Sequence, residues 1–73
     1  MEVSVIVKVL NQFKLDDKLA NIVKKNGYFF NGKIMLVDSK PVQIDDRKLG
    51  PSVIAISEIS EVRESLIGGI EDG

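Results

Sequence analysis

The stretch NGYFFNGKIMLVD, residues 26–38, decides the fold class of this chain. Large apolar side chains recur at every second position within it, which is typical of a β-strand with one buried face. Gly32 interrupts the run and predicts a bend or bulge that curls the strand into a barrel. The alternation predicts that one face carries core residues and that Phe29 lies on the opposite face. The residues predicted for the core face are Tyr28, Phe30, Ile34 and Leu36.

Shorter strand signals follow this long strand. Asp38-Ser39-Lys40-Pro41 predicts a turn, and Pro41 at the first position of the next strand costs no ladder hydrogen bond. Strict alternation then predicts that Val42 and Ile44 point inward. Closely spaced strands with turn signals indicate a small barrel or sandwich. The predicted strands are 42–45, 52–56 and 59–62, with a polar connection at 46–51 that ends in a Gly-Pro pair.

The first 27 residues fit two assignments. Valines at positions 3, 5, 7 and 9 alternate as in a strand, yet apolar residues between Val3 and Phe13 also share one helical face. Residues 15–23 have helical spacing too, with Asp16-Asp17 at the start and Asn26-Gly27 as the cap at the end. The alternative is a strand over residues 19–25 with Asn26-Gly27 as a hairpin turn. We expect one helix and one strand, and the periodicity leaves the choice open.

Composition limits what the chain can do. It has 73 residues, 44% of them hydrophobic, and no cysteine or histidine. These absences exclude disulfides, thiolate or imidazole metal sites, and Ser-His or Cys-His catalysis. We therefore predict one non-enzymatic domain over residues 1–67 with a loose tail at 68–73, no cofactor and no metal. A domain this small buries little apolar surface alone, which favours a homo-oligomer.

The N-terminal sequence predicts a cytoplasmic protein. The apolar stretch Val3–Leu10 is broken by Lys8 and is too short to cross a bilayer. The start, Met-Glu-Val-Ser, lacks the basic region of a secretion signal. We expect no association with membranes.

Charge is unevenly divided along the chain. Residues 1–40 carry a net charge of +3 and residues 41–73 a net charge of −4. Such a division favours one face for an anionic partner. The adjacent pairs Asp16-Asp17 and Asp45-Asp46 are predicted as a helix start and a turn rather than as Mg²⁺ ligands. The candidate phosphate contacts are Lys24, Lys25, Lys33, Lys40, Arg47 and Lys48.

Residues 26–62 resemble the Sm/LSm family, and most closely its bacterial Hfq branch. The shared pattern is an Asn-Gly turn, a bent strand with a second glycine five residues after the first, and a closing aspartate six residues later. Here these are Asn26-Gly27, Gly32 and Asp38. The strand-turn-strand of residues 53–62 resembles the second motif of the family.

The resemblance implies a five-stranded bent antiparallel barrel with one helix in the N-terminal region. It also implies a homo-oligomeric ring of five to seven subunits that binds single-stranded RNA in RNA processing or as an RNA chaperone. The chain departs from the family pattern at two turns. Ser39 and Lys40 stand where the family has a base-stacking residue, and Ile56-Ser57-Glu58 stand in place of a basic pair, where Glu58 would repel phosphate. The alternative is an SH3-like barrel that binds protein.

The resemblance and the charges together select the candidate nucleic-acid contacts. We expect RNA to run along the turn that contains Lys40, past cations predicted to lie nearby. Base discrimination should be slight, because lysines contact phosphate without reading sequence. The candidate residues are Phe29, Lys33, Ser39, Lys40, Arg47, Lys48 and Ser57.

Overall fold

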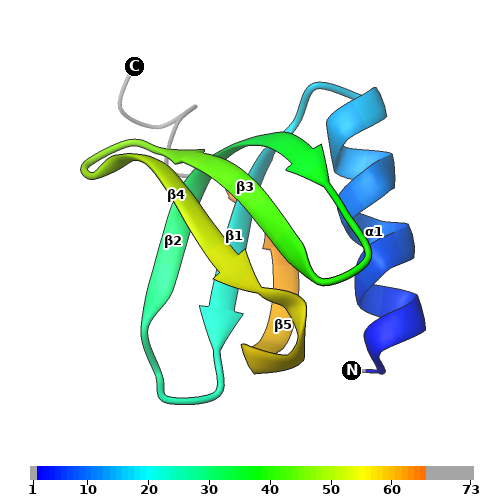
Figure 1. Ribbon diagram of the computed structural model, residues 1–73. Helices are drawn as coiled ribbons and strands as arrows, with labels where there is room; N and C mark the ends of the chain where they lie inside the picture. Colours follow the sequence, from blue (N-terminus) through cyan, green and yellow to red (C-terminus); the bar gives the residue numbers. More distant parts are fainter. Residues whose placement is uncertain (1, 66–73) are drawn as a thin grey trace.

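The structure is a computed structural model that describes residues 2–65. It contains one helix followed by five antiparallel strands in a single sheet, in the order β4-β3-β2-β1-β5 (Figure 1). The predicted mainly β class with one N-terminal helix is confirmed, whereas the predicted tail at 68–73 lies outside the described residues. The elements are α1 (Val3–Leu15), β1 (Leu19–Lys24), β2 (Phe29–Val37), β3 (Pro41–Asp46), β4 (Gly50–Ala55), the 3₁₀ turn η1 (Ile56–Glu58) and β5 (Ile59–Glu64).

The helix is the first of the two ambiguous segments. Helical spacing places Ile6 and Leu10 on one buried face, whereas the alternating valines Val3 and Val5 are exposed. The helix ends at Leu15, and two residues later Asp17 has a left-handed φ of 55°. Two backbone bonds close this end, from Asp17 N to Lys14 O and from Lys18 N to Phe13 O, a pattern typical of helix C-termini. Asp16-Asp17 therefore ends a helix, and its prediction as a helix start was wrong.

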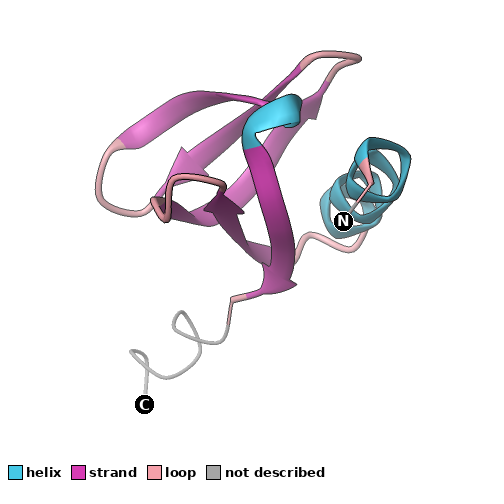
Figure 2. Ribbon diagram, turned by 90° about the horizontal axis from the view of Figure 1, so that it is seen from below, coloured by secondary structure: helices cyan, strands magenta, loops and turns pink. Residues whose placement is uncertain are grey.

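The second segment is strand β1, joined to β2 by a tight turn. Gly27 has a φ of +90°, which favours glycine. The Asn26 side-chain oxygen accepts a hydrogen bond from Tyr28 N, and Lys24 N donates to Tyr28 O. Asn26-Gly27 is thus the hairpin turn of the strand alternative. Seen from below, α1 lies beside the curved sheet as a separate layer (Figure 2).

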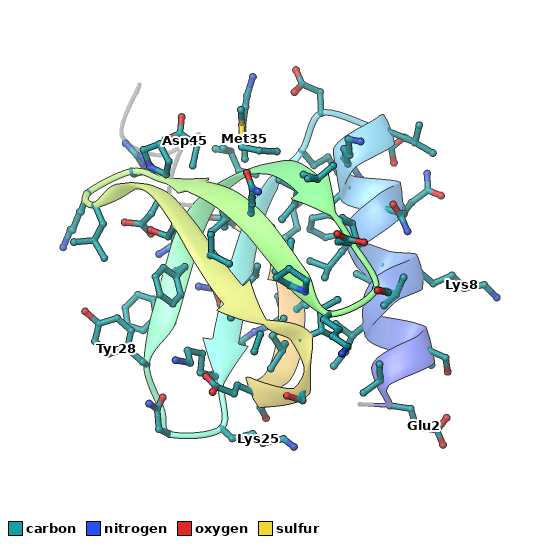
Figure 3. The ribbon with its side chains drawn as sticks, in the orientation of Figure 1. Glu2, Lys8, Lys25, Tyr28, Met35 and Asp45 are labelled. Atoms are coloured by element: carbon teal, nitrogen blue, oxygen red, sulfur yellow. The ribbon has the colours of Figure 1, made fainter. Side chains whose placement is uncertain are left out.

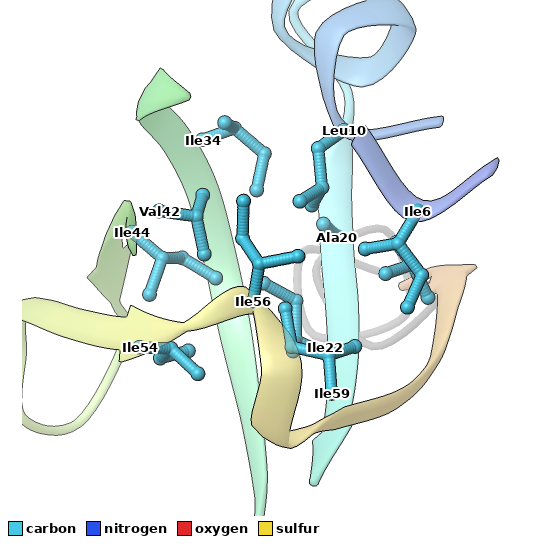
Figure 4. Close-up of a cluster of buried hydrophobic side chains, with 11 residues drawn as sticks. Ile6, Leu10, Ala20, Ile22, Ile34, Val42, Ile44, Ile54, Ile56 and Ile59 are labelled. Carbon is cyan, nitrogen blue, oxygen red and sulfur yellow. The ribbon is translucent and has the colours of Figure 1, made fainter. Parts of the chain in front are cut away.

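The core lies between α1 and the concave face of the sheet (Figure 4). Val42 and Ile44 point inward, as predicted. Within residues 2–65, no helix is long and apolar enough to cross a membrane. The buried apolar residues are Ile6, Leu10, Ala20, Ile22, Ile34, Val42, Ile44, Ile54, Ile56, Ile59 and Val62.

The long strand departs from its predicted alternation. Its register against β3 shifts between Ile34 and Leu36, so the bulge lies at Met35 rather than at Gly32. Beyond the bulge the faces exchange: Leu36 is exposed, contrary to the prediction, and Val37 packs against the core.

The two ends of the polar connection are also corrected. Residues 46–51 were predicted as a connection, but β3 continues through Asp46 and β4 begins at Gly50. Only residues 47–49 form the turn, because the φ of +80° at Gly50 lets the chain reverse without further residues. Pro51 lies inside edge strand β4, a position that tolerates proline.

Gly32 has a different role from the predicted bulge. It pairs with Ala20 of β1 and with Asp46 of β3 in regular register. A Cβ atom at this position would collide with the backbone carbonyl of Asp45. The glycine is therefore required because β3 passes directly over it.

We expect Gly32→Ala to destabilise the fold by about 3 kcal/mol, the upper range for overpacking, because the obstructing atoms belong to backbone. Gly27→Ala is the matched control: no atom lies near its added Cβ. Its cost is the backbone strain of a positive φ, about 1–2 kcal/mol. Urea unfolding at equal protein concentration measures the free energy of unfolding of both variants. Equal losses in the two variants would contradict the close approach at Gly32.

Candidate functional site

The turn between β3 and β4 is held by a buried carboxylate. Asp46 is 9% exposed, and its Oδ2 accepts hydrogen bonds from Lys48 N (3.0 Å) and Leu49 N (2.9 Å). Its Oδ1 accepts a third bond from Asn31 N of β2 (2.9 Å), and Arg47 N donates to Asn31 O (2.9 Å). The turn is thus bonded to Asn31, near the start of β2, through both the N–H and the C=O of that residue.

These bonds determine the ionisation of Asp46. Burial alone would raise its pKa. The backbone N–H groups of Leu49, Asn31 and Lys48, with the charge of Lys48, outweigh burial and lower the pKa of Asp46 below its ordinary value of 3.8. Asp46 is therefore a carboxylate throughout the neutral range.

A groove of about 640 Å³ lies between this turn and the start of β2. Tyr28 (56% exposed) and Phe29 (57% exposed) line one side, and Arg47, Lys48 and Leu49 line the other. In Figure 3, Tyr28 projects outward from the start of β2. Two exposed aromatic rings therefore share a groove with two cations and an exposed leucine.

Tyr28 was predicted in the core, and this was wrong. It precedes β2, beyond the last pair of the β1–β2 ladder, Val23 with Phe29, so no strand covers it. Its ring packs edge-on against Phe30 at a centroid distance of 5.5 Å. Phe30 is half-buried against the core, as predicted, and Phe29 is exposed. The position of Tyr28 and Phe29 directly after a hairpin turn could have predicted from the sequence that they are exposed.

Three other candidates gather at the opposite end of β3. Ile56 N donates to Lys40 O (2.7 Å), which brings the turn with Ser39 and Lys40 beside Ser57 of η1. All three side chains are exposed. Lys40 directly precedes β3, and Arg47 directly follows it. Six strand residues separate them by roughly 20 Å, and Figure 1 shows the two turns at opposite ends of β3. The prediction that Lys40 lies near Arg47 and Lys48 is therefore wrong.

Two of the lysines are already engaged in ion pairs. Lys33 lies near the β3–β4 turn, in a shallow depression with Arg47 and Lys48, and its Nζ is 3.2 Å from Asp17 Oδ1. Lys24 Nζ is 3.0 Å from Glu58 Oε1. Glu58 in the second turn is therefore partly neutralised, which reduces its repulsion of phosphate.

The adjacent carboxylates of Asp45 and Asp46 lie on opposite faces of β3. Asp45 is exposed, whereas Asp46 points inward, because neighbouring strand residues face opposite sides. Within residues 2–65, no group of three or more acidic residues is placed to hold a metal ion.

Comparison with solved structures identifies the architecture. The crystal structure of Hfq described as a pleiotropic translational regulator superposes with a TM-score of 0.70 at 22% identity, over 80% of this chain and 95% of that one. An Hfq protein from Anabaena sp. superposes with a TM-score of 0.69 at 19% identity, over 88% of this chain and 100% of that one. The chain has the Sm-like fold of Hfq. No family model and no curated protein matches the sequence.

The Sm-like fold explains which parts of the sequence resembled Hfq. The bent strand β2 and the strand-turn-strand of β4, η1 and β5 occupy the positions that the two motifs predicted. Two residues that shape the groove, Asn31 and Leu49, were missed. Asn31 lies inside an apolar strand and Leu49 inside a turn, and neither type marks a ligand site by itself.

The lowered pKa of Asp46 predicts an acid-sensitive contribution to stability. A carboxyl whose folded pKa lies below its unfolded value stabilises the fold fully above about pH 3.8, and this contribution disappears as the pH falls through the folded pKa. The free energy of unfolding should therefore differ most between the parent and Asp46→Asn near pH 7, and the difference should shrink as the pH falls below about 3.8. Urea unfolding across this range measures the difference, and a difference that does not change with pH would argue against the assignment.

Proposed function

We propose that this protein binds single-stranded RNA in the groove between Tyr28-Phe29 and the β3–β4 turn. One observation carries the proposal: two exposed aromatic rings and two cations line a single groove. Aromatic rings stack on bases, and cations bind the phosphate backbone. A groove built this way tolerates many sequences, because every base has a face that can stack. Lys33 of β2 lines the shallow depression that it shares with Arg47 and Lys48, and it extends the cationic surface along that strand.

Residues 39, 40 and 57 form a separate contact in this proposal. Lys40 supplies a cation at the other end of β3, while Ser39 and Ser57 supply hydroxyl groups. No aromatic ring stands at these three positions. This contact therefore holds phosphate and contributes little to base preference.

The proposed active form is a ring of five to seven identical subunits. Strands β4 and β5 are the two edges of the sheet, and each has a row of backbone groups without a strand partner in the described chain. Pairing β4 of one copy with β5 of the next removes both edges, which otherwise promote aggregation. The Hfq described as a translational regulator supports a role of this class, in RNA processing or as an RNA chaperone.

A protein-binding role is the second candidate. Leu36 pairs with Gln43 and Gln43 with Val53, so two exposed apolar side chains flank a glutamine on the outer face of β2, β3 and β4. Exposed Met35 lies beside Leu36. Such a face favours a protein partner. Protein binding through apolar residues would depend weakly on salt, whereas RNA binding weakens steeply as salt rises.

For RNA binding, we expect Phe29→Ala to weaken affinity for labelled oligo-A and oligo-U by about 1–3 kcal/mol without changing the salt dependence, because a stacking contact is lost. Lys48→Glu should weaken both and lower the slope of log affinity against log salt by about one. Fluorescence anisotropy at two salt concentrations measures these effects. Lys8→Glu, at an exposed position of α1, is the control for a charge reversal outside the groove. If Phe29→Ala and Lys48→Glu both bind RNA with the affinity of the parent, the proposal is wrong.

The second contact is tested by Lys40→Glu. This variant should bind a short oligonucleotide as the parent does, because the groove is intact. It should bind a long one more weakly, with a salt slope lower by about one. Equal affinity of the variant and the parent for the long RNA would remove Lys40 from the proposed site.

The ring is tested at the β4 edge. Because Ile56 N bonds to Lys40 O, ladder alternation directs the Ile54 N–H toward β3 and the Val53 N–H toward the free edge. Val53→Pro removes only this outward donor, so we expect a folded 8.1 kDa monomer by light scattering. Val53→Thr, which keeps the donor, should retain the parental oligomer. An oligomer of parental size in Val53→Pro would contradict edge pairing.

A further inference from the structure

The β3–β4 turn presents three consecutive exposed residues, Arg47, Lys48 and Leu49, to the groove. Such short turns on the surface adopt many conformations unless their backbone groups are bonded. Here the backbone N–H groups of all three residues have acceptors in the structure. Two of these three bonds end on one carboxylate oxygen, Asp46 Oδ2.

We propose that Asp46 is a positioning residue for RNA binding, which holds the turn so that Lys48 and Leu49 face Tyr28 and Phe29 before RNA arrives. The inference rests on the proposed function. Its geometric basis is the bridge that Asp46 makes between the turn and Asn31, three residues from Tyr28 along β2. Asn31 is itself fixed, since its Oδ1 accepts bonds from Asn21 Nδ2 (2.9 Å) and Ser65 Oγ (3.1 Å). The turn is thus anchored to β1, β2 and the end of β5.

A positioning role and simple charge repulsion predict opposite effects of neutralising Asp46 on the affinity for RNA. A carboxylate beside a phosphate site repels RNA, so its neutralisation would strengthen binding if charge alone mattered. If Asp46 positions the turn, its neutralisation releases Lys48 and Leu49 and weakens binding, because the RNA must then order the turn itself. The sign of the change therefore separates the two explanations.

Asp45 provides a matched control. It is adjacent in sequence and exposed, and among residues 2–65 its side chain makes no hydrogen bond or ion pair. Asp45→Asn removes the same charge at nearly the same place without touching the turn. In Asp46→Asn, one carboxylate oxygen becomes an NH₂ donor. The side chain can then no longer accept from both Asn31 N and the turn.

The experiment compares the parent, Asp45→Asn and Asp46→Asn for binding of labelled oligo-A, with amide hydrogen exchange of Lys48 and Leu49 in the RNA-free proteins. We expect Asp46→Asn to weaken binding about tenfold, the size of one lost net hydrogen bond, and to speed exchange at both amides. Asp45→Asn should bind as tightly as the parent or tighter, with unchanged exchange. Equal binding by the two variants, or weaker binding without faster exchange, would overturn the inference.

A second variant covers the possibility that Asp46→Asn does not fold, as judged by circular dichroism. The hydroxyl of Asp46→Ser can still accept a bond from the turn, in the manner of serine-stabilised turns. We expect Asp46→Ser to bind oligo-A more weakly than the parent and to exchange the Lys48 and Leu49 amides faster; parental affinity with fast exchange would overturn the inference. If the parent itself binds no RNA, the proposed function fails, and the exchange data still decide whether Asp46 fixes the turn.

Discussion

The bonds between Asn31 and Asp46 are the constraint on which the rest of the structure depends. Asn31 accepts a bond from Arg47 N and donates to the Asp46 carboxylate, so β2 is joined to the β3–β4 turn at one residue. The next residue, Gly32, has no side chain, which lets β3 pass over it. Close approach and mutual hydrogen bonding therefore occur at adjacent residues of β2. The same joint places the turn beside Tyr28 and Phe29 and so creates the groove.

Small size makes the edges of the sheet as important as its interior. The core of residues 2–65 holds eleven buried apolar side chains, most of them isoleucine or valine. Such β-branched residues suit a bent sheet. The strands at its two edges, β4 and β5, have backbone groups without a strand partner in the described residues. Ring closure between copies would satisfy both edges at once. It would also repeat the groove around the ring, so that one RNA could engage several copies and gain affinity through multivalency.

The two ends of β3 carry different sets of exposed side chains. At one end, Ser39, Lys40 and Ser57 offer one cation and two hydroxyl groups, with Glu58 already paired to Lys24. At the other end, aromatic rings and cations share a groove. The departures from the Hfq pattern and the exposed aromatic residues therefore point to the same conclusion, which is that the β3–β4 end carries most of the proposed binding.

The sequence predicted the fold well because the signals that specify it are local. Asn26-Gly27, the apolar run of β2 and Pro41 each act within a few residues. The helix was left open since Val3, Val5, Ile6 and Leu10 satisfy both periods, and only tertiary packing of Ile6 and Leu10 decides between them.

The candidate site was predicted less completely, because its geometry depends on long-range placement. Sequence proximity could not show that β3 holds Lys40 and Lys48 apart. The bulge at Met35 exchanged the exposed and buried faces, so Leu36 was assigned to the wrong side. Asp46 resembled an ordinary turn residue, because its bond to Asn31 joins positions fifteen residues apart.

The most direct test of the account is a ¹⁵N-resolved NMR titration of the intact protein with a short oligo-A. If a short RNA fills the groove alone, the amide shifts should occur at Tyr28, Phe29, Lys48 and Leu49 and leave Ser39, Lys40 and Ser57 unchanged. Shifts confined to Ser39, Lys40 and Ser57, or no shifts at saturating RNA, would contradict the account.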